Sequence, residues 1–436
     1  MQVGSGPVLA LMAVSMAPVA TVSTGEPVPQ LAVAGAMVQT IGPGTSQLLR
    51  ASSSAGMENR IQLALTPPMG WNGFNHFHLA VTEATVEHEA LALVHSGMRD
   101  AGYVYVNLDG GWNLRQRTAD GSLQPDPRKF PHGIRPVAAY VHSLGLKFGI
   151  YTSAGVMNCA GTSAGSYGHY SHDAATFASW GVDYLKLDWC YIPYRNYPHL
   201  THAQVSRELA SQMLAALDQT GRRILYDVNA TEDQPWTWAG DLSHLWRTAP
   251  DSRDAYGSMV YNFSTNVALH EAAKPGRWND PDMLEVGNGG MSLVEYRAQF
   301  SLWAEMAAPL IAGNDLVAMS PATRSILTNR EVISVDQDPL GVQGHPIASE
   351  GGHWVLAKPL ADGDRAVVLF NQTSRPALIS TTLQQIGFQN QRTCDLIDLW
   401  TGEVREAAGT ISSAVPAHGV VMYEVTGAQA GPIPVQ

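Results

Sequence analysis

The sequence predicts an α/β fold, a (β/α)8 TIM barrel followed by a C-terminal antiparallel β-sandwich. Between about residues 66 and 330, short apolar runs that end in polar residues alternate with amphipathic, helix-like stretches. This alternation is typical of parallel strands joined by helices, and its length suits an eightfold barrel. After about residue 340 the helical period disappears, and short apolar runs are separated by turn residues. That change indicates a small antiparallel β-sandwich.

Eight strand candidates lie in the first region, and several are unbroken apolar runs, as strands buried on both faces are. They are the segments 67–72, 103–109, 146–152, 182–188, 222–228, 244–248, 277–280 and 309–314. The predicted helices are 82–100, 134–145, 172–181, 201–219, 254–273, 292–306 and 320–329. Gly145 and Gly181 close two of them, because glycine commonly follows the last helical turn.

The pattern divides the chain into four parts. They are a signal-like or disordered lead-in at 1–60, a catalytic barrel at 61–342, the sandwich at 343–428 and a tail at 429–436. The expected sandwich strands lie within 353–360, 364–373, 376–387, 392–403 and 419–426.

The lead-in contains a short apolar run at 8–20, which is too short to span a membrane. It resembles the apolar part of a secretory signal, with an A-x-A pattern at 34–36 downstream, although a basic n-region is missing. We therefore expect a secreted or periplasmic protein without a membrane span.

The composition excludes some partners. The net charge of −12 argues against binding nucleic acid through its phosphates. Three cysteines in 436 residues make neither a disulfide scaffold nor a zinc cluster; one disulfide with a free cysteine and buried free thiols are both open. The candidate histidine ligands lack a strong metal spacing such as HExxH, and we interpret them as ordinary polar groups. They are His76, His78, His169 and His172.

Polar residues stand where several predicted strands end. Asn72, Asp109, Tyr151 and Asp188 all occupy such positions, and the active sites of these barrels lie at the carboxyl ends of the strands. Asp251 follows the sixth strand candidate. Two carboxyl groups are the minimum for hydrolysing a glycosidic bond. Acids that cap loops or bind a metal remain the alternative at this point.

Six segments, taken in order, resemble glycoside hydrolase family 27, the α-galactosidase and α-N-acetylgalactosaminidase family. The resemblance covers about residues 65–345. The segments are "TPPMGWNGFNHF" (66–77), "NLDGGW" (107–112), "PDPRKFPHGIRPVAAYVHSLGLKFGIYT" (125–152), "YLKLDWC" (184–190), "WNDPDMLEVGN" (278–288) and "SVDQDPLG" (334–341).

The resemblance implies roles for individual residues. Asp188 in "LKLD" matches the family's nucleophile, and Asp251 in "RTAPD" matches its general acid/base. It also implies a disulfide between Cys159 and Cys190 beside the pocket, and leaves Cys394 without a partner. The implied sugar-binding residues are Trp71, Phe74, Asp109, Tyr151, Lys186, Asn229, Arg247 and Asp282. For Trp71 the alternative is plain core packing, and for Arg247 it is pairing with an acid at the barrel mouth.

The implied activity is that of a retaining exo-α-glycosidase that removes terminal α-galactosyl residues through a covalent glycosyl-enzyme. Such an enzyme needs no metal or organic cofactor, and we expect a monomer or homodimer. Retention requires the two carboxyls to lie about 5–5.5 Å apart. Lys186, on the same strand face as Asp188, should favour its ionised form, whereas the pKa of Asp251 should sit higher because it must donate a proton.

Two positions depart from the family pattern. Relatives carry two adjacent acids after the second strand, but here Asp109 is followed by Gly110. Asn229 stands where relatives place Cys or Glu, and Ala230 replaces a Trp. Losing a charged hydrogen bond to a sugar hydroxyl costs about 1.5–3 kcal/mol. The alternatives are therefore an isomalto-dextranase-like α-1,6-glucan hydrolase or a β-L-arabinopyranosidase. A sugar-binding protein without catalysis and a metal-dependent barrel hydrolase are further alternatives.

Overall fold

The computed structural model describes residues 62–389, 391–427 and 431–433 of the chain. The expected lead-in at 1–60, with its signal-like segment, and most of the tail at 429–436 lie outside the described residues. A search of the described helices finds none that is both long and apolar enough to cross a membrane.

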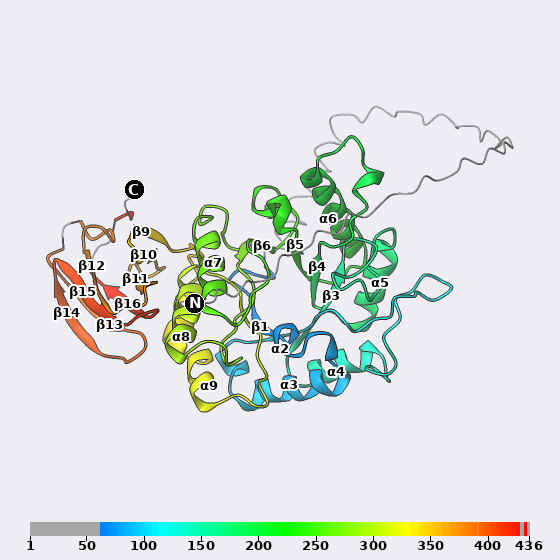
Figure 1. Cartoon of the computed structure of the whole chain (residues 1–436), viewed down its shortest axis with the longest axis horizontal. Helices are drawn as coiled ribbons and strands as arrows, with labels where there is room; N and C mark the ends of the chain where they lie inside the picture. The colour runs from blue at the N-terminus through cyan, green and yellow to red at the C-terminus, as the bar shows by residue number, and fades with distance from the viewer. Residues whose placement is uncertain (1–61, 390, 428–430, 434–436) are drawn as a thin grey trace, which may run out of the picture. The chain divides into compact units, whose positions relative to one another are not determined.

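Eight parallel strands form the first sheet, in the order β7-β6-β5-β4-β3-β2-β1-β8 (Figure 1). Their bounds are β1 Met69–Asn72, β2 Tyr105–Leu108, β3 Lys147–Ser153, β4 Tyr184–Asp188, β5 Leu225–Asn229, β6 Leu245–Arg247, β7 Trp278–Asp280 and β8 Leu310–Ala312. A parallel bridge between Leu284, just beyond β7, and Ala312 of β8 joins the two ends of the sheet. Each strand overlaps its predicted segment, and the predicted fold class is confirmed.

Helices separate most of these strands. The α-helices are α2 Phe74–Phe77, α3 Glu83–His95, α4 Ile134–Ser143, α5 Tyr170–Trp180, α6 His202–Gln219, α7 Tyr256–Val267, α8 Leu293–Glu305, α9 Pro321–Leu327 and α10 Arg330–Asp336. The 3-10 helices are η1 His78–Ala80, η2 Arg99–Ala101, η3 Tyr194–Asn196, η4 Thr231–Asp233, η5 Pro235–Thr237 and η6 Ala239–Asp241. Only η4, η5 and η6 connect β5 to β6, where no α-helix was predicted.

The helix predictions differ from the structure mainly at helix ends. The helix predicted at 82–100 stops at His95, because Gly97 adopts φ +84° and the chain turns into η2. The helix predicted at 254–273 ends at Val267, and turns follow it. The helix α10 was not predicted. Asn329 caps it by accepting hydrogen bonds from the backbone N–H groups of Glu331 and Val332.

The C-terminal region consists of antiparallel strands in two sheets. The larger has the order β14-β13-β16-β11-β10-β9, and the smaller pairs β12 with β15. The bounds are β9 His345–Glu350, β10 His353–Pro359, β11 Arg365–Asn371, β12 Ala377–Thr382, β13 Thr393–Asp398, β14 Val404–Ala408, β15 Thr410–Val415 and β16 Val420–Thr426. The sequence missed β9, β14 and β15. In β14 only one residue is buried, so the strand lacks an alternating apolar pattern.

Strand β11 is buried on both faces, which explains its unbroken apolar run. Val367 and Leu369 belong to the hydrophobic core of the C-terminal region, between its two sheets. Val368 and Phe370 point the other way and join the core of the barrel, where Phe370 meets Phe263 of α7 edge-on. The alternation of side chains along one strand therefore serves two cores.

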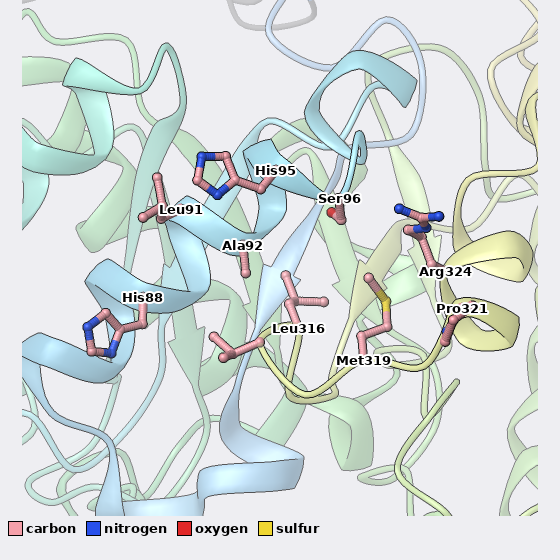
Figure 2. Close-up of a pocket in the computed structure, with 10 residues that line it drawn as sticks. His88, Leu91, Ala92, His95, Ser96, Leu316, Met319, Pro321 and Arg324 are labelled. Carbon is pink, nitrogen blue, oxygen red and sulfur yellow. The ribbon is translucent and has the colours of Figure 1, made fainter.

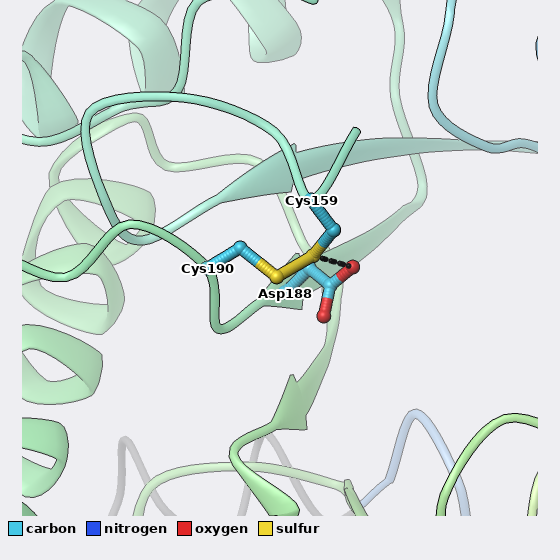
Figure 3. A group of neighbouring side chains, drawn as sticks. All are labelled: Cys159, Asp188 and Cys190. Atoms are coloured by element: carbon cyan, nitrogen blue, oxygen red, sulfur yellow. Dashed lines mark hydrogen bonds between the residues drawn. A yellow bond between two sulfur atoms is a disulfide. The ribbon is translucent and has the colours of Figure 1, made fainter. Parts of the chain in front are cut away.

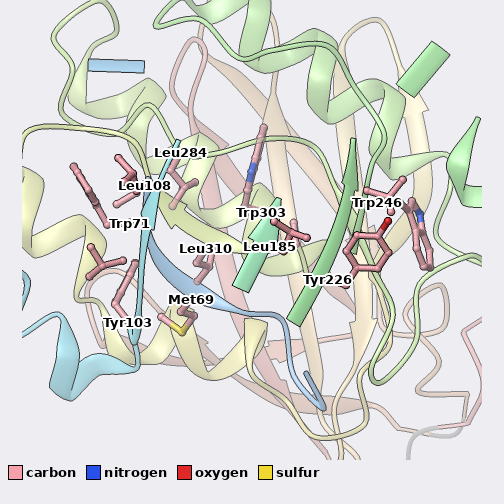
Figure 4. Close-up of a cluster of buried hydrophobic side chains, with 14 of the residues drawn as sticks. Met69, Trp71, Tyr103, Leu108, Leu185, Tyr226, Trp246, Leu284, Trp303 and Leu310 are labelled. Atoms are coloured by element: carbon pink, nitrogen blue, oxygen red, sulfur yellow. The ribbon is translucent and has the colours of Figure 1, made fainter. Parts of the chain in front are cut away.

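Large aromatic and aliphatic side chains fill the barrel core, as Figure 4 shows. Trp71, Trp246 and Trp303 are among its fully buried side chains, and each ring removes a large apolar area from water. Much of the high tryptophan content is therefore structural. The polar residues that end the strands lie beyond this core, at one edge of the sheet.

Candidate active site

A pocket lies at the carboxyl ends of the barrel strands. Eight of the ten predicted site residues line it: Phe74, Asp109, Tyr151, Lys186, Asp188, Arg247, Asp251 and Asp282. They come from the ends of six different strands or the loops that follow them. The parallel topology therefore gathers side chains that are as much as 208 positions apart, from Phe74 to Asp282.

Asp109 forms one charged side of the pocket with Lys186. Its Oδ2 accepts hydrogen bonds from Lys186 Nζ at 2.8 Å and from Asn72 Nδ2 at 2.7 Å. Its Oδ1 accepts one from the backbone N–H of Gly110 at 2.7 Å. Burial acts to lower the pKa of Lys186, but Asp109 together with Asp188 and Asp282 outweighs it and holds that pKa above its ordinary value. The ammonium therefore stays charged beside the nucleophile candidate.

Asp188 ends β4 and is held by its neighbours at both oxygens. Oδ1 accepts hydrogen bonds from the backbone N–H of Trp189 at 2.9 Å and from Asn229 Nδ2 at 3.0 Å. Oδ2 lies 3.0 Å from Cys159 Sγ. Burial raises the pKa of Asp188, and Lys186 acts in the opposite direction. The orientation of the carboxylate is thus fixed by three contacts.

Cys159 and Cys190 form a disulfide next to this carboxylate (Figure 3). Because a disulfide sulfur carries no proton, the dashed contact in Figure 3 is an oxygen–sulfur contact and not a donated hydrogen bond. The disulfide confirms the pairing that the family resemblance implied, and Cys394 is free and buried. The bridge ties the loop after β3 to the end of β4.

Arg247 is the centre of the second charged side. Its Nη1 lies 2.9 Å from Asp251 Oδ1, and its Nη2 lies 2.9 Å from Asp282 Oδ1. Its Nε lies 3.8 Å from Asp280 Oδ2. The side chain of Arg247 is 2% exposed, whereas that of Asp251 is 76% exposed. Arg247 is therefore buried, while Asp251 beside it faces solvent. The guanidinium lowers the pKa of Asp251.

Asp282 has a strained backbone that its surroundings hold in place. Its φ is +82°, in the left-handed region that a non-glycine residue rarely adopts. Asp282 Oδ2 accepts a hydrogen bond from the backbone N–H of Ser252 at 2.6 Å. Its carbonyl accepts one from Trp303 Nε1 at 2.8 Å, and its own N–H donates to Asp280 Oδ1 at 2.9 Å. Strain of this kind commonly marks a functional site.

A second, larger pocket lies between α3 and the loop after β8 (Figure 2). Its cavity volume is about 610 Å³, against about 50 Å³ for the pocket at the strand ends. His88, His95, Leu316, Met319 and Arg324 are among its lining residues. The described residues that line it include no carboxyl group, so it lacks the pair of acids that glycoside hydrolysis requires.

Comparison with known proteins identifies the chain. The family model described as "Alpha galactosidase A" matches residues 66–338, and the model described as "Alpha galactosidase C-terminal beta sandwich domain" matches residues 350–425. The chain belongs to glycoside hydrolase family 27. A probable α-galactosidase of Dictyostelium discoideum is 43% identical over 371 residues, covering 84% of this chain and 93% of that protein.

Further relatives of family 27 agree with this assignment. An α-galactosidase of Oryza sativa subsp. japonica is 42% identical over 365 residues, covering 84% of this chain and 85% of that protein. The crystal structure of α-galactosidase I from Mortierella vinacea superposes with a TM-score of 0.80 at 35% identity, covering 85% of this chain and 99% of that chain. The fold and the family therefore extend over both the barrel and the sandwich.

Two predicted sugar-binding residues lie elsewhere in this family 27 chain. Trp71 is 1% exposed and packs in the core, where its indole N–H donates to the carbonyl of Asn314 at 2.8 Å. Core packing was the alternative interpretation of this residue, and the structure supports it. Asn229 does not line the pocket but donates to Asp188. It therefore contacts the nucleophile candidate directly through this hydrogen bond.

The predicted order of the two carboxyl pKa values is wrong in this structure. Burial raises the pKa of Asp188, whereas Arg247 lowers that of Asp251. The sequence argument considered Lys186 beside Asp188, and it considered a pairing of Arg247 with an acid, but it did not identify Asp251 as that acid. Burial decides the direction of the Asp188 pKa, and Arg247, four residues before Asp251, decides that of the Asp251 pKa. Neither cause can be read from a strand pattern.

Sequence analysis also missed several pocket residues. Asn75, Asn158 and Met283 line the pocket, and Glu285 supports it by accepting a hydrogen bond from Asn75 Nδ2 at 2.5 Å. Burial raises the pKa of Glu285 to about 7. Asn75, Met283 and Glu285 belong to two of the quoted family segments, which was the available signal.

The described residues offer two groups with metal-ligand proximity. In the first, Asp188 lies beside Cys159 and Cys190, whose sulfurs form the disulfide and are therefore not thiolate ligands. The second group, in the sandwich, joins Asp362, Asp364 and Glu424. The histidines considered from the sequence belong to neither group of described residues.

Proposed function

We propose that this chain is a retaining exo-α-galactosidase, with Asp188 as the nucleophile and Asp251 as the general acid/base. The observation that carries the proposal is that both carboxyl groups line one pocket together with Asp109, Lys186 and Arg247. The α-galactosidase relatives at 42–43% identity support the same activity for this chain.

The mechanism needs two steps. Asp188 attacks the anomeric carbon while Asp251 protonates the glycosidic oxygen, so the glycosidic bond breaks, the aglycone leaves as an alcohol, and a covalent galactosyl-enzyme forms at Asp188. Asp251 then takes a proton from a water molecule that attacks the anomeric carbon, the bond to Asp188 breaks, and galactose leaves with overall retention. The high exposure of the Asp251 side chain fits a group that faces the leaving group and then water. The two carboxyls should lie about 5–5.5 Å apart, and no cofactor is required.

Recognition of the terminal sugar falls to the fixed charges around these acids. Asp109 can accept hydrogen bonds from sugar hydroxyls, and Lys186 and Arg247 can donate to them. Hydrogen bonds to ionised groups are the strong ones, and these three side chains are already oriented by one another or by other acids. Phe74 and Tyr151 supply apolar surface for the carbon face of the ring.

The disulfide bears on where the protein works. Disulfides form and persist in oxidising compartments, so the Cys159–Cys190 bridge supports a secreted or periplasmic location. A carbohydrate partner follows from the proposed activity. Whether the protein is a monomer or a homodimer stays a prediction that size-exclusion chromatography with light scattering can test.

Turnover of nitrophenyl α-galactoside, followed by NMR of the first-formed sugar, tests the proposal. We expect α-galactose to appear first, with activity unchanged in excess chelator. First release of β-galactose would overturn retention. Absence of turnover on every glycoside would favour a binding protein, and loss of activity in chelator would favour a metal-dependent hydrolase. Nitrophenyl β-L-arabinopyranoside and dextran, tested in parallel, address the alternative sugars.

A further inference from the structure

We infer that Asn262, in the middle of α7, is a positioning residue that sets the place of Asp251 relative to Asp282. The inference rests on the proposed function, because it assigns to Asn262 the alignment of the general acid/base. Asn262 does not line the pocket, and its side chain is buried, with 1% of the residue exposed.

The amide of Asn262 joins the two loops that carry these acids. Its Nδ2 lies 3.0 Å from the carbonyl oxygen of Pro250, which directly precedes Asp251. It lies 2.9 Å from the carbonyl oxygen of Pro281, which directly precedes Asp282. The hydroxyl oxygen of Ser252 lies 3.0 Å from the same nitrogen. One amide group thus contacts the backbone on the N-terminal side of both acids.

The orientation of this amide follows from its partners. Two carbonyl oxygens can only accept hydrogen bonds, so the NH2 group and not the amide oxygen must face them. Asn262 Oδ1 is buried and has no hydrogen-bond partner among the described residues. An asparagine inside a helix is already a weak helix former, and leaving its oxygen unpaired adds a further cost. The two bridging N–H bonds offset that cost.

The backbone cannot join the two proline carbonyls to each other. The paired strands end at Arg247 and Asp280, and Thr248 N–H adds a last backbone bond to the carbonyl of Asp280 at 2.8 Å. Beyond that point Pro250 and Pro281 each offer a carbonyl but lack an N–H, so neither can donate to the other. A third group with two N–H bonds is needed, and Asn262 supplies it.

The consequence concerns proton donation. Asp282 Oδ2 accepts from Ser252 N–H, and Arg247 contacts both Asp251 and Asp282, so the two acids and Arg247 form one unit. Without Asn262 the loop around Asp251 loses one of its links to the loop around Asp282, the one between the backbone carbonyls that precede the two acids. The carboxyl of Asp251 then spends less time within reach of the glycosidic oxygen, while Asp188 on β4 stays in place.

The test compares substrates that differ in their need for an acid. Asn262→Leu keeps the approximate volume without N–H groups, and Asn262→Asp keeps the shape but places acceptors against the two carbonyls. We expect either variant to lower kcat/KM at least about tenfold on a galactosyl disaccharide, whose sugar leaving group needs protonation. On dinitrophenyl α-galactoside, which loses an acidic phenol, the loss should stay below about threefold.

Asn266→Leu is the matched control. Asn266 is also buried on α7, but its side chain bonds Thr248 Oγ1 and Met306 Sδ and not the two proline carbonyls. This variant should change kcat/KM by the same factor on both substrates. Equal losses on the two substrates for Asn262→Leu and Asn262→Asp, or no loss, would overturn the inference. If the unaltered protein cleaves neither galactoside, the proposed function fails, and that outcome is seen before any variant is measured.

Discussion

Arg247 Nη1 lies 2.9 Å from Asp251 Oδ1, so the proposed proton donor rests against a buried cation. This contact favours the ionised form of Asp251, although the first chemical step needs the protonated form. Burial acts on Asp188 in the other direction and favours its protonated form, although the nucleophile must be ionised. In the free enzyme, therefore, only a minority of molecules has Asp188 ionised and Asp251 protonated. Because the two carboxyl groups interact, the apparent pKa values describe the pair and not each residue alone.

A pH profile of kcat/KM follows from these directions. Because the pKa of Asp188 lies above that of Asp251, the acid limb follows the lower titration, mostly that of Asp251, and the alkaline limb follows the higher one, mostly that of Asp188. We expect an optimum on the acid side of neutrality. Arg253 also lowers the pKa of Asp251, so Arg253→Gln should move the acid limb to higher pH and leave the alkaline limb in place. An optimum above about pH 7 would contradict these directions.

Substitution of the two carboxyls should separate their roles. Asp188→Ala and Asp251→Ala should each lower kcat by about a thousandfold or more, because each removes a group of the double displacement. With nitrophenyl α-galactoside, azide should rescue Asp188→Ala by attack from the nucleophile's side and give β-galactosyl azide. In Asp251→Ala azide should intercept the galactosyl-enzyme and give the α-azide. Asp282→Asn is the control, since azide should not restore the activity that this variant loses.

Gly110 lines the pocket where relatives are expected to carry a second acid. A Cβ built there would lie 3.6 Å from Tyr151 Cε1, which is ordinary van der Waals contact. We therefore expect Gly110→Asp to fold and to raise the preference for α-galactoside over β-L-arabinopyranoside by about ten- to a hundredfold, the effect of one charged hydrogen bond. Gly110→Ala fills space without an acceptor and should not. If the unaltered protein already prefers galactoside by more than about a thousandfold, Gly110 does not limit selectivity.

The sequence predicted the barrel strands well because parallel strands buried on both faces appear as apolar runs. Asp188 was found for the same reason, since it is the polar residue that ends such a run. The strand β14 was missed because four of its five residues are exposed, and a mostly polar strand has no distinctive period.

The parts of the site that escaped prediction depend on contacts between distant segments. Trp71 and Phe74 lie three residues apart, yet only Phe74 lines the pocket, because Trp71 belongs to β1 and turns into the core. Asn262 is one of many asparagines in the sequence, and only the fold places its amide between two proline carbonyls. The direction of the Asp251 pKa likewise depends on the geometry of Arg247.

The last prediction concerns stability and a buried acid at the end of α8. Glu305 is fully buried, and neither of its carboxyl oxygens has a hydrogen-bond partner among the described residues. Burial raises its pKa to about 8, and Lys358 of β10 opposes this. Between the ordinary value of 4.5 and about 8, the folded chain holds a proton that the unfolded chain has lost. The free energy of unfolding must therefore fall as pH rises through this interval, by up to about 1.4 kcal/mol per pH unit for one proton.

Glu305→Gln removes this titration, so its free energy of unfolding, measured with urea between pH 5 and pH 8, should fall less steeply than that of the unaltered protein. Glu295→Gln, on the same helix, is the control with the opposite sign. Burial acts to raise the pKa of Glu295, but the N–H of Ser292 and the ring of His418 outweigh it and lower that pKa. The control should therefore lose stability at pH 7 and converge with the unaltered protein as the pH falls below the ordinary glutamate range. Parallel pH slopes for Glu305→Gln and the unaltered protein would mean that Glu305 is ionised in the folded chain, with Lys358 outweighing the burial.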